Sequence, residues 1–525
     1  MANLTTMTRR DVLEGAAIGA LGVCALSASS ALAEEAASLE PTALEEADVV
    51  VVGSGIGGFS SAIRSAQNGA KVIMVEKLGY VGGATNFAEV CFGVGSRMQK
   101  EAGIDYTYLE VLHDECEFHN YRVNRILWEK LAKTSGQAID WFSDLVEPRG
   151  GGFMAVLGEN LLVAHAYKPT VIEKTGQIST KGAGQIAILE TIAEELGITI
   201  YTDCPAKKLV TTDGAVTGVI CDHDGEILQI NAKAVILAAS GFANDPEYVA
   251  TFGSDMKQMA FSGCPGATGD AIHMAKEVGA AHKGSLCLQM MGGSLPLPSS
   301  MGDHINQVFR NEPYQLWVNQ DGRRFVTEKL AVFTQAANAI DMQDATWSLM
   351  DDALVDFYQT YATLIGAGSY IMAGTVLDQT RAGLEEFLES KPEYVLKADS
   401  LEELAQKMGV PAENLIATVE RYNELCAQGE DTDFGKPGEF LKPLTTPPFY
   451  AGRLFTLLLT TVGGIRINEN AQVLNEDAKP IPGLYLVGSD ADGFSGETYG
   501  VNLPGSTQSL GLTFGMIAAD HACGA

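Results

Sequence analysis

Closely spaced glycines near the start of the chain are the residues best suited to bind a phosphate group. Gly53, Gly55 and Gly58 belong to the run GSGIGG, and Glu76 follows them. Glycine allows a tight turn and lets the backbone approach a pyrophosphate, and a carboxylate about 20 residues further on is placed to accept hydrogen bonds from a ribose. The spacing predicts a dinucleotide-binding turn.

The elements around this motif have the required order. Residues 47–52 form a short apolar run rich in valine, which predicts a buried strand, and 59–68 have helical composition. A second apolar run covers 71–75 and ends at Glu76. The three segments predict a βαβ unit whose helix N-terminus faces the phosphates.

Several later segments also end at positions where the protein backbone is expected to contact a bound cofactor. These motifs, in chain order, are GGAT at 82–85, VILAASGF at 235–242, GATGD at 266–270, GRRFVTE at 322–328, PPFYAG at 447–452, TVGGIRIN at 461–468, IPGLYLVGSDADG at 481–493 and GSTQSLGLTFG at 505–515. With the glycine turn, they resemble the FAD-dependent fumarate reductase flavoprotein family (FAD-dependent oxidoreductase 2 type). That family also contains urocanate reductases, other enoate reductases and 3-oxosteroid 1-dehydrogenases. The resemblance extends from about Asp48 to the end of the chain.

The resemblance implies an α/β fold, with a Rossmann-like FAD-binding domain of the GR2 type built from both ends of the chain and an inserted α+β capping domain. Near the end of the cap, 401–428 has a helical pattern, with Pro411 beginning a second helix. The expected divisions are a linker at 34–47, the first part of the FAD-binding domain at 48–255, the cap at 256–440 and the second part at 441–525.

The family motifs also imply which residues bind FAD. The residues carried over are Gly53, Gly55, Gly58, Glu76, Gly82, Gly83, Ala84, Thr85, Gly241 and Asp490, with Ser506, Ser509 and Leu510 along the flavin ring. A reduced flavin supplies hydride to an activated C=C bond, and a protein acid then protonates the neighbouring carbon. The resemblance therefore implies an FAD-dependent oxidoreductase acting on CH–CH groups.

Three departures from the fumarate reductases remove charge from the expected site. Those enzymes hold an arginine four residues after the glutamate of their RFxxE motif, and here the fourth residue after Glu328 is Val332. They place a histidine before the TxGG motif, where this chain has Thr460. They keep a carboxylate-binding arginine near the closing glycine loop, and 499–504 contains no basic residue. These changes argue against a small dicarboxylate substrate.

The residues left around the expected pocket favour a larger and less charged substrate, such as an aryl enoate or a cyclic enone. The pocket residues are Met290, Met291, Phe333, Tyr450 and Thr460. Tyr499 is the favoured acid or polariser, because a phenol donates to a carbonyl. Glu497 and Glu328 are candidate proton relays, with a structural ion pair to arginine as the alternative for Glu328.

The beginning of the chain resembles an export signal. Arg9 and Arg10 precede an apolar stretch at 16–26 and a small-residue cleavage site ending at Ala33. We therefore expect a twin-arginine signal at 1–33 and a periplasmic or otherwise extracytoplasmic enzyme. The alternative is a Sec signal or an uncleaved anchor whose two arginines adjoin by chance. The expected electron donor is a separate membrane-associated carrier, such as a cytochrome or a quinol-linked protein.

Composition and residue spacing argue against nucleic acid as a partner and against a metal site. The chain has 525 residues and a formal net charge of −31, which disfavours nucleic acid as a partner. None of the 9 cysteines forms a CxxC pair, and no histidine spacing resembles a metal site, so no metal is expected. Reduction of an unsaturated compound is the leading interpretation. The alternatives are a 3-oxosteroid-type dehydrogenase running the reverse reaction and a non-catalytic flavin electron carrier.

Overall fold

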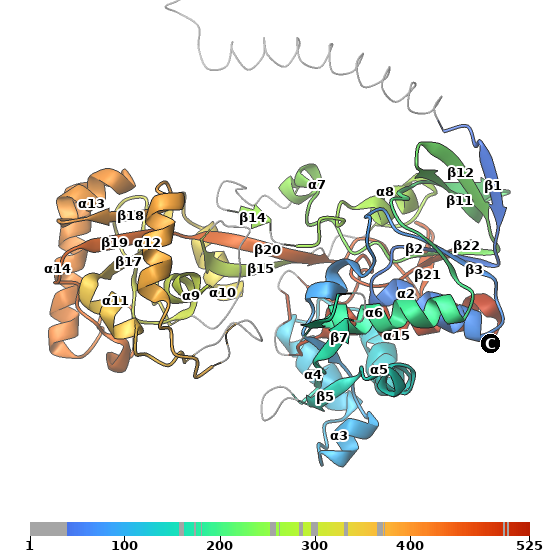
Figure 1. Ribbon diagram of the computed structural model, residues 1–525, viewed down its shortest axis with the longest axis horizontal. Helices are drawn as coiled ribbons and strands as arrows, with labels where there is room; N and C mark the ends of the chain where they lie inside the picture. The colour runs from blue at the N-terminus through green and yellow to red at the C-terminus, as the bar shows by residue number, and fades with distance from the viewer. Residues whose placement is uncertain are drawn as a thin grey trace, which may run out of the picture.

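The computed structural model describes residues 39–156, 162–172, 175–179, 181–251, 259–261, 263–282, 287–295, 303–329, 334–364, 371, 373–496, 499–500 and 503–525. The chain forms two lobes, and both ends of the described chain lie in the larger one (Figure 1). Each lobe has its own hydrophobic core. The larger lobe carries the predicted dinucleotide turn.

A six-stranded sheet forms the centre of the larger lobe. Its strands are β2 (Val49–Val52), β3 (Val72–Val75), β9 (Thr199–Tyr201), β13 (Ala234–Leu237), β21 (Gln472–Leu474) and β22 (Pro480–Leu486). Their order is β21-β22-β13-β2-β3-β9, and every neighbouring pair except β21 with β22 is parallel. Strand β2 has β3 on one side and β13 on the other, so ligands are expected at its carboxyl end.

Helices cover this sheet and complete the lobe. They are α2 (Ile56–Gln67), α3 (Arg97–Glu101), α4 (Tyr108–Phe118), α5 (Arg125–Val146), α6 (Gly182–Glu195), α7 (Pro246–Ala250), α8 (Asp270–Glu277) and α15 (Ser506–Cys523). Helices α2 and α15 lie together although they come from opposite ends of the chain (Figure 1). A Cβ on Gly511 would lie 3.0 Å from the Gly57 nitrogen, so glycine allows this close approach.

Smaller sheets surround the central one. Their strands are β1 (Ala43–Glu46), β10 (Ala206–Thr212), β11 (Ala215–His223) and β12 (Glu226–Asn231); β4 (Val90–Phe92), β5 (Phe153–Val156) and β6 (Ala164–Tyr167); and β7 (Thr170–Ile172) with β8 (Gln177–Ser179). Strand β1 pairs in parallel with β12. This corrects the prediction of a linker over 34–47, because 43–46 belong to a sheet of the larger lobe.

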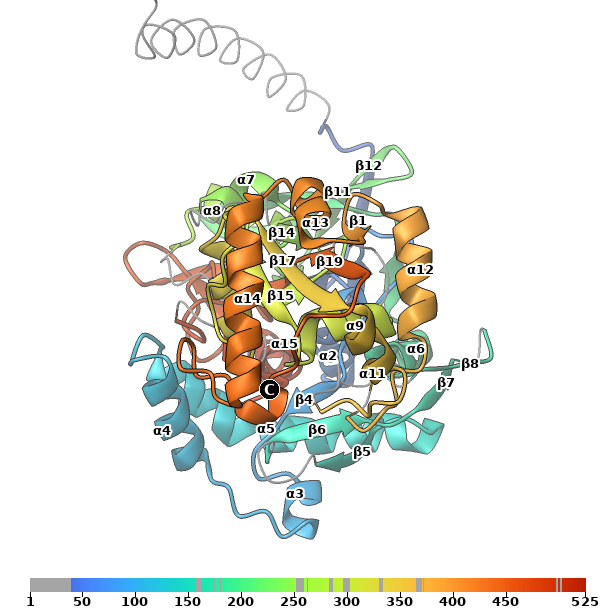
Figure 2. The same cartoon turned by 90° about the vertical axis from the view of Figure 1, so that its left-hand side faces the viewer.

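The smaller lobe is the cap. Its sheet contains β16 (Leu316–Asn319), β17 (Thr346–Asp351), β18 (Val395–Ala398) and β19 (Phe449–Arg453), and its helices are α9 (His304–Asn311), α10 (Thr334–Asp341), α11 (Asp352–Tyr358), α12 (Thr380–Ser390), α13 (Leu401–Met408) and α14 (Ala412–Gln428). The strands are antiparallel in the order β16-β17-β19-β18. Figure 2 views the molecule from the cap side, with α12 and α14 flanking the sheet.

A three-stranded sheet joins the lobes. Its strands are β14 (Met259–Phe261), β15 (Cys287–Ser294) and β20 (Phe455–Val462), with β20 in the middle. The cap core extends from Leu295 to Leu454, whereas Ala271 and Cys287 belong to the core of the larger lobe. The cap thus begins and ends later in the chain than the predicted 256–440.

No helix in the described ranges has the length and apolar character needed to cross a bilayer.

Candidate functional site: a dinucleotide cavity in the larger lobe

The turn between β2 and α2 requires glycine for steric reasons. Gly53 has a φ of +101°, and a Cβ there would lie 2.4 Å from the Ala238 carbonyl oxygen. A Cβ on Gly58 would lie 2.0 Å from the Gly53 carbonyl oxygen. At Gly55, the closest atom to an added Cβ is 3.6 Å away. Gly53 and Gly55 line a cavity, which places the N-terminus of α2 against it.

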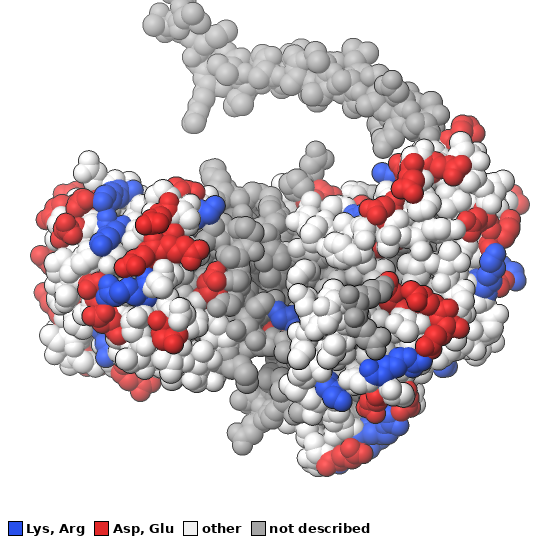
Figure 3. All heavy atoms as spheres, in the orientation of Figure 1, with Lys and Arg blue, Asp and Glu red and all other residues white. Residues whose placement is uncertain are grey.

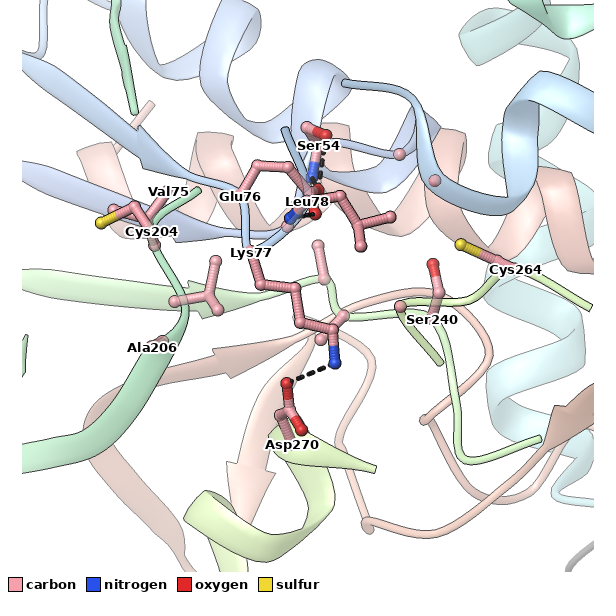
Figure 4. A pocket seen from close by; sticks show the side chains of 17 residues that line it. Ser54, Val75, Glu76, Lys77, Leu78, Cys204, Ala206, Ser240, Cys264 and Asp270 are labelled. Atoms are coloured by element: carbon pink, nitrogen blue, oxygen red, sulfur yellow. Dashed lines mark hydrogen bonds and ion pairs between the residues drawn. The ribbon is translucent and has the colours of Figure 1, made fainter. Parts of the chain in front are cut away.

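Glu76 lies at the end of β3, on the wall of the same cavity (Figure 4). Its Oε2 accepts hydrogen bonds from the Ser54 hydroxyl at 2.6 Å and from the Ser54 N–H at 3.1 Å, and its Oε1 accepts from the Leu78 N–H at 2.9 Å. Two carboxylate oxygens offer about four acceptor sites, so Glu76 keeps capacity for ribose hydroxyls.

The segment 82–85 packs directly onto the glycine turn. The Gly82 N–H donates to the Ser54 hydroxyl at 3.0 Å, and Thr85 Oγ1 accepts from the Ile56 N–H at 3.0 Å. Gly82 has a φ of +111°, and Gly83 also lines the cavity. Ala84 lies between Gly83 and Thr85 in a short 3₁₀ helix, Gly83–Phe87. The glycine turn and the GGAT segment, which are separate motifs in the sequence, are therefore in contact in the structure.

Gly241 and Asp490 meet after the ends of β13 and β22. Asp490 is 1% exposed, and burial raises its pKa from the ordinary value to about 7, although the Gly241 backbone N–H donates to it and opposes that rise. Its Oδ1 has no hydrogen-bond partner within the described parts of the chain. A buried acceptor without a donor fits a ligand that carries hydroxyl groups, as the ribityl chain and riboses of FAD do.

The N-terminus of α15 follows Gly505, whose φ is +85°. Ser506 is the first residue of the helix and is half-buried. The Ser509 hydroxyl is buried and lies 3.0 Å from Thr513 Oγ1, and Leu510 is buried beside it. Ser509 and Leu510 thus pack within the lobe, and Ser506 is the more exposed of the predicted flavin-ring residues.

Tyr499 is buried, with 7% of its surface exposed. Its hydroxyl lies 3.3 Å from Thr507 Oγ1 in α15. Burial raises the pKa of the phenol above its ordinary value. Tyr499 therefore keeps its proton at neutral pH, as a proton donor requires.

Two predicted site residues belong instead to the interior of the cap. Glu328 accepts from Arg324 at 2.8 and 2.9 Å and lies 3.3 Å from Lys436 Nζ, with a fully buried side chain. This geometry supports the structural ion pair and not the proton relay. Tyr450 was predicted for the substrate pocket, and this is corrected: it is buried in the cap core and donates to Asp352 at 3.1 Å.

The structure describes some of the remaining predicted residues and not others. Glu497 and Phe333 lie outside the described residues. Met290 and Met291 lie in β15, which pairs with β20 between the two lobes. Thr460 lies in β20, opposite Gln289, and is half-buried.

Two residues that contact the predicted site, Ser54 and Lys77, were not predicted from the sequence. Ser54 links Glu76 to Gly82. Lys77 extends into the cavity and lies 2.7 Å from Asp270 (Figure 4). Ser54 lies inside the glycine motif, and Lys77 directly follows Glu76. Their position next to predicted site residues could have identified them in the sequence. Among the residues described, no three metal-ligating side chains gather into a metal site.

Comparisons with known proteins agree with this geometry. The family described as "FAD binding domain" matches residues 48–505. A vinyl phenol reductase of Lactiplantibacillus plantarum is 31% identical over 489 residues, which cover 90% of this chain and 96% of that protein. The open conformation of a flavocytochrome c3 fumarate reductase matches with a TM-score of 0.71 at 26% identity, covering 94% of this chain and 81% of that one.

A steroid-converting enzyme has the same fold. The 3-ketosteroid delta1-dehydrogenase of Sterolibacterium denitrificans matches with a TM-score of 0.72 at 19% identity, covering 91% of this chain and all of that one. The expected α/β fold, the FAD cofactor and the family resemblance are confirmed. The chain belongs to the FAD binding domain family, and it is an FAD-dependent oxidoreductase acting on CH–CH bonds, a C=C reductase of the fumarate reductase group.

Proposed function

We propose that the protein reduces the C=C bond of an unsaturated compound with an aryl or other apolar group, an enoate or enone type, and not a small dicarboxylate. The observation that carries this proposal is the loss of charge at three places where fumarate reductases hold charged side chains. Those places are Val332, Thr460 and the segment 499–504. Two buried carboxylates need charged partners, and the sequence supplies none at these three places.

The similarity to a vinyl phenol reductase supports the same substrate class. That relative is named for a substrate with an aromatic ring and no carboxylate. The match covers 90% of this chain, so it includes both the dinucleotide cavity and the cap. We infer that aromatic C=C substrates are the first to test.

The residues of this chain have separate tasks in the reaction. When bound, FAD supplies hydride chemistry at the flavin ring. Glu76, Gly55 and Asp490 would hold its polar parts, the last through a buried oxygen that lacks a donor. Tyr499 holds a proton at its phenol oxygen next to Thr507 and would donate it to the substrate.

The test is anaerobic photoreduction of the FAD-loaded protein, followed by addition of 4-vinylphenol, cinnamate, urocanate, fumarate or a steroid enone. We expect rapid reoxidation of the flavin by the first two compounds and slow reoxidation by fumarate. Fast reoxidation by fumarate would contradict the interpretation of the missing charges. If every compound fails while a dye reoxidises the flavin, the protein is an electron carrier.

The reverse reaction is the second candidate, because the chain shares its fold with a 3-ketosteroid delta1-dehydrogenase. It predicts that a saturated 3-oxosteroid bleaches the oxidised flavin anaerobically in the absence of an acceptor, and that an added dye acceptor reoxidises the flavin and is itself reduced. The same preparation tests this directly, since oxidised and reduced flavin differ in visible absorbance.

We propose that residues 1–33 direct export by the twin-arginine route and that a membrane-associated carrier delivers the electrons. Arg9 and Arg10 carry the signal. Replacement of both by lysine should leave the enzyme in the cytoplasm, with flavin bound and dye-linked activity intact. Fractionation of cells after expression measures this. Export of the double variant at the normal level would contradict the proposal.

A further inference from the structure

The backbone at 493–496, which comes after Asp490 and before Tyr499 in the chain, is held by residues at the C-terminal end of α4 and the N-terminal end of α5. A Cβ on Gly493 would lie 2.8 Å from Asn124 Cβ, so the contact is close. Three hydrogen bonds fix the segment: Asn124 N–H to the Gly493 carbonyl at 2.7 Å, Trp128 Nε1–H to the Phe494 carbonyl at 3.0 Å, and Gly496 N–H to His119 Nδ1 at 3.1 Å.

The hydrogen bond from the Gly496 N–H determines which ring nitrogen of the buried His119 carries the proton. His119 is 4% exposed, and its Nδ1 accepts the Gly496 N–H, so Nδ1 carries the lone pair and Nε2 carries the ring proton. Nε2 lies 3.3 Å from a carboxylate oxygen of Glu115, whose side chain is 2% exposed. This is an ion-pair distance and not a hydrogen bond, because Nε2 has no hydrogen-bond partner within the described parts of the chain; the nearby carboxylate favours the tautomer with the proton on Nε2.

Glu115 also acts electrostatically on the candidate proton donor. Burial is the largest cause that raises the pKa of Tyr499, and the negative charge of Glu115 adds a small contribution in the same direction. Tyr499 comes three residues after Gly496 in the chain. A shift of Gly496 would therefore move the phenol relative to Thr507 in α15.

We infer that Glu115 and His119 are positioning residues for Tyr499: the negative charge of Glu115 favours the proton on Nε2, and Nδ1 of the imidazole then fixes the backbone at Gly496. This inference rests on the proposed role of Tyr499 as proton donor. Neither Glu115 nor His119 needs to touch the substrate.

Two isosteric substitutions separate positioning from general packing. In His119→Asn the side-chain oxygen takes the place of Nδ1 and still accepts the Gly496 N–H. In His119→Gln the amide reaches the place of Nε2 and leaves that N–H without an acceptor. His113 lies on the exposed face of α4, the helix that His119 caps at its C-terminus, so His113→Gln is the matched control.

The first measurement is amide hydrogen exchange of the FAD-loaded full chain, which needs no substrate. We expect His119→Gln to speed exchange at Gly496 and Tyr499 by about tenfold or more, and His119→Asn and His113→Gln to leave it close to the parent. Unchanged exchange at both amides in His119→Gln would overturn the inference, whatever the substrate proves to be.

The second measurement is the rate of flavin reoxidation by the best compound of the panel, compared with reoxidation by ferricyanide. We expect His119→Gln to lower kcat roughly ten- to a hundredfold with little change in KM, and to leave the ferricyanide rate unchanged. His119→Asn should recover most of kcat.

A double-mutant cycle with Tyr499→Phe completes the test. If His119 acts through Tyr499, the loss in the double variant should equal that of Tyr499→Phe alone. Additive losses would overturn the inference. If Tyr499→Phe alone is fully active, the proposed proton donor is wrong, and the exchange data still report whether His119 fixes the segment.

Discussion

At the scale of single residues, two buried acids that were both predicted for the site have different roles, and burial alone does not distinguish them. Glu328 is buried with Arg324 and Lys436 as partners, whereas the buried Asp490 keeps one oxygen without a donor in the described parts of the chain. A satisfied buried charge stabilises a core, and an unsatisfied one indicates a missing ligand. The sequence could not separate these cases, because the partners of Glu328 include Lys436, more than a hundred residues away.

The raised pKa of Asp490 leads to a pH-dependent prediction. The folded protein binds this proton more tightly than the unfolded chain, so the unfolding free energy of the apoprotein should fall as pH rises from about 4 to about 7. Asp490→Asn should flatten that part of the profile. It should also weaken FAD binding about tenfold at pH 8, because hydroxyl donors prefer a carboxylate.

Urea unfolding at several pH values and fluorescence titration with FAD measure both effects. The exposed Asp477→Asn is the control and should change neither quantity. An unchanged pH profile in Asp490→Asn would mean that another group causes the slope.

Glu328→Gln tests whether that carboxyl is structural. Removing its charge leaves Arg324 and Lys436 partly unpaired inside the cap, which costs about 3–5 kcal/mol when a buried pair is broken. We expect a lower unfolding temperature together with an unchanged rate of substrate-dependent flavin reoxidation in the protein that remains folded. A selective loss of that rate, with stability unchanged, would restore the proton-relay role.

At the scale of elements, local patterns predicted the parts of the fold that depend on neighbours in the chain. The βαβ unit around Gly53 and the two helices α13 and α14, with Pro411 before the second, match the sequence predictions. Pairing of β1 with β12 and the limits of the cap were missed. Both depend on contacts between distant segments, which leave little signal in local periodicity.

The packing of α2 on α15 gives the prediction at this scale. A Cβ on Gly515 would lie 2.0 Å from Ser60 Oγ and 2.8 Å from the Gly57 carbonyl oxygen. Gly515→Ala should therefore push the two helices apart, destabilise the protein by about 1–3 kcal/mol and lower its FAD content, because α2 carries the dinucleotide turn. Thermal unfolding and the flavin-to-protein absorbance ratio measure this.

Ser60→Ala added to Gly515→Ala removes only the nearer of the two clashes, so it should restore part of the lost stability. Equal FAD content in the parent and in Gly515→Ala would show that the two helices separate without disturbing the turn.

At the scale of the whole molecule, we expect the net negative charge to control the rate at which charged electron donors reach the protein. The formal net charge is −31, and acidic side chains cover more of the face in Figure 3 than basic ones do. Such a field attracts cationic donors over distances comparable to the Debye length, which falls from about 30 Å at 0.01 M salt to about 10 Å at 0.1 M.

We expect the rate of flavin reduction by a reduced viologen, which is a cation, to fall several-fold over this range. Reduction by the dithionite anion should become faster over the same range, since salt screens its repulsion. Stopped-flow absorbance of the flavin at matched donor concentrations measures both rates. Parallel salt dependence for the two donors would mean that the charge near the flavin, and not the net charge of the molecule, controls their approach.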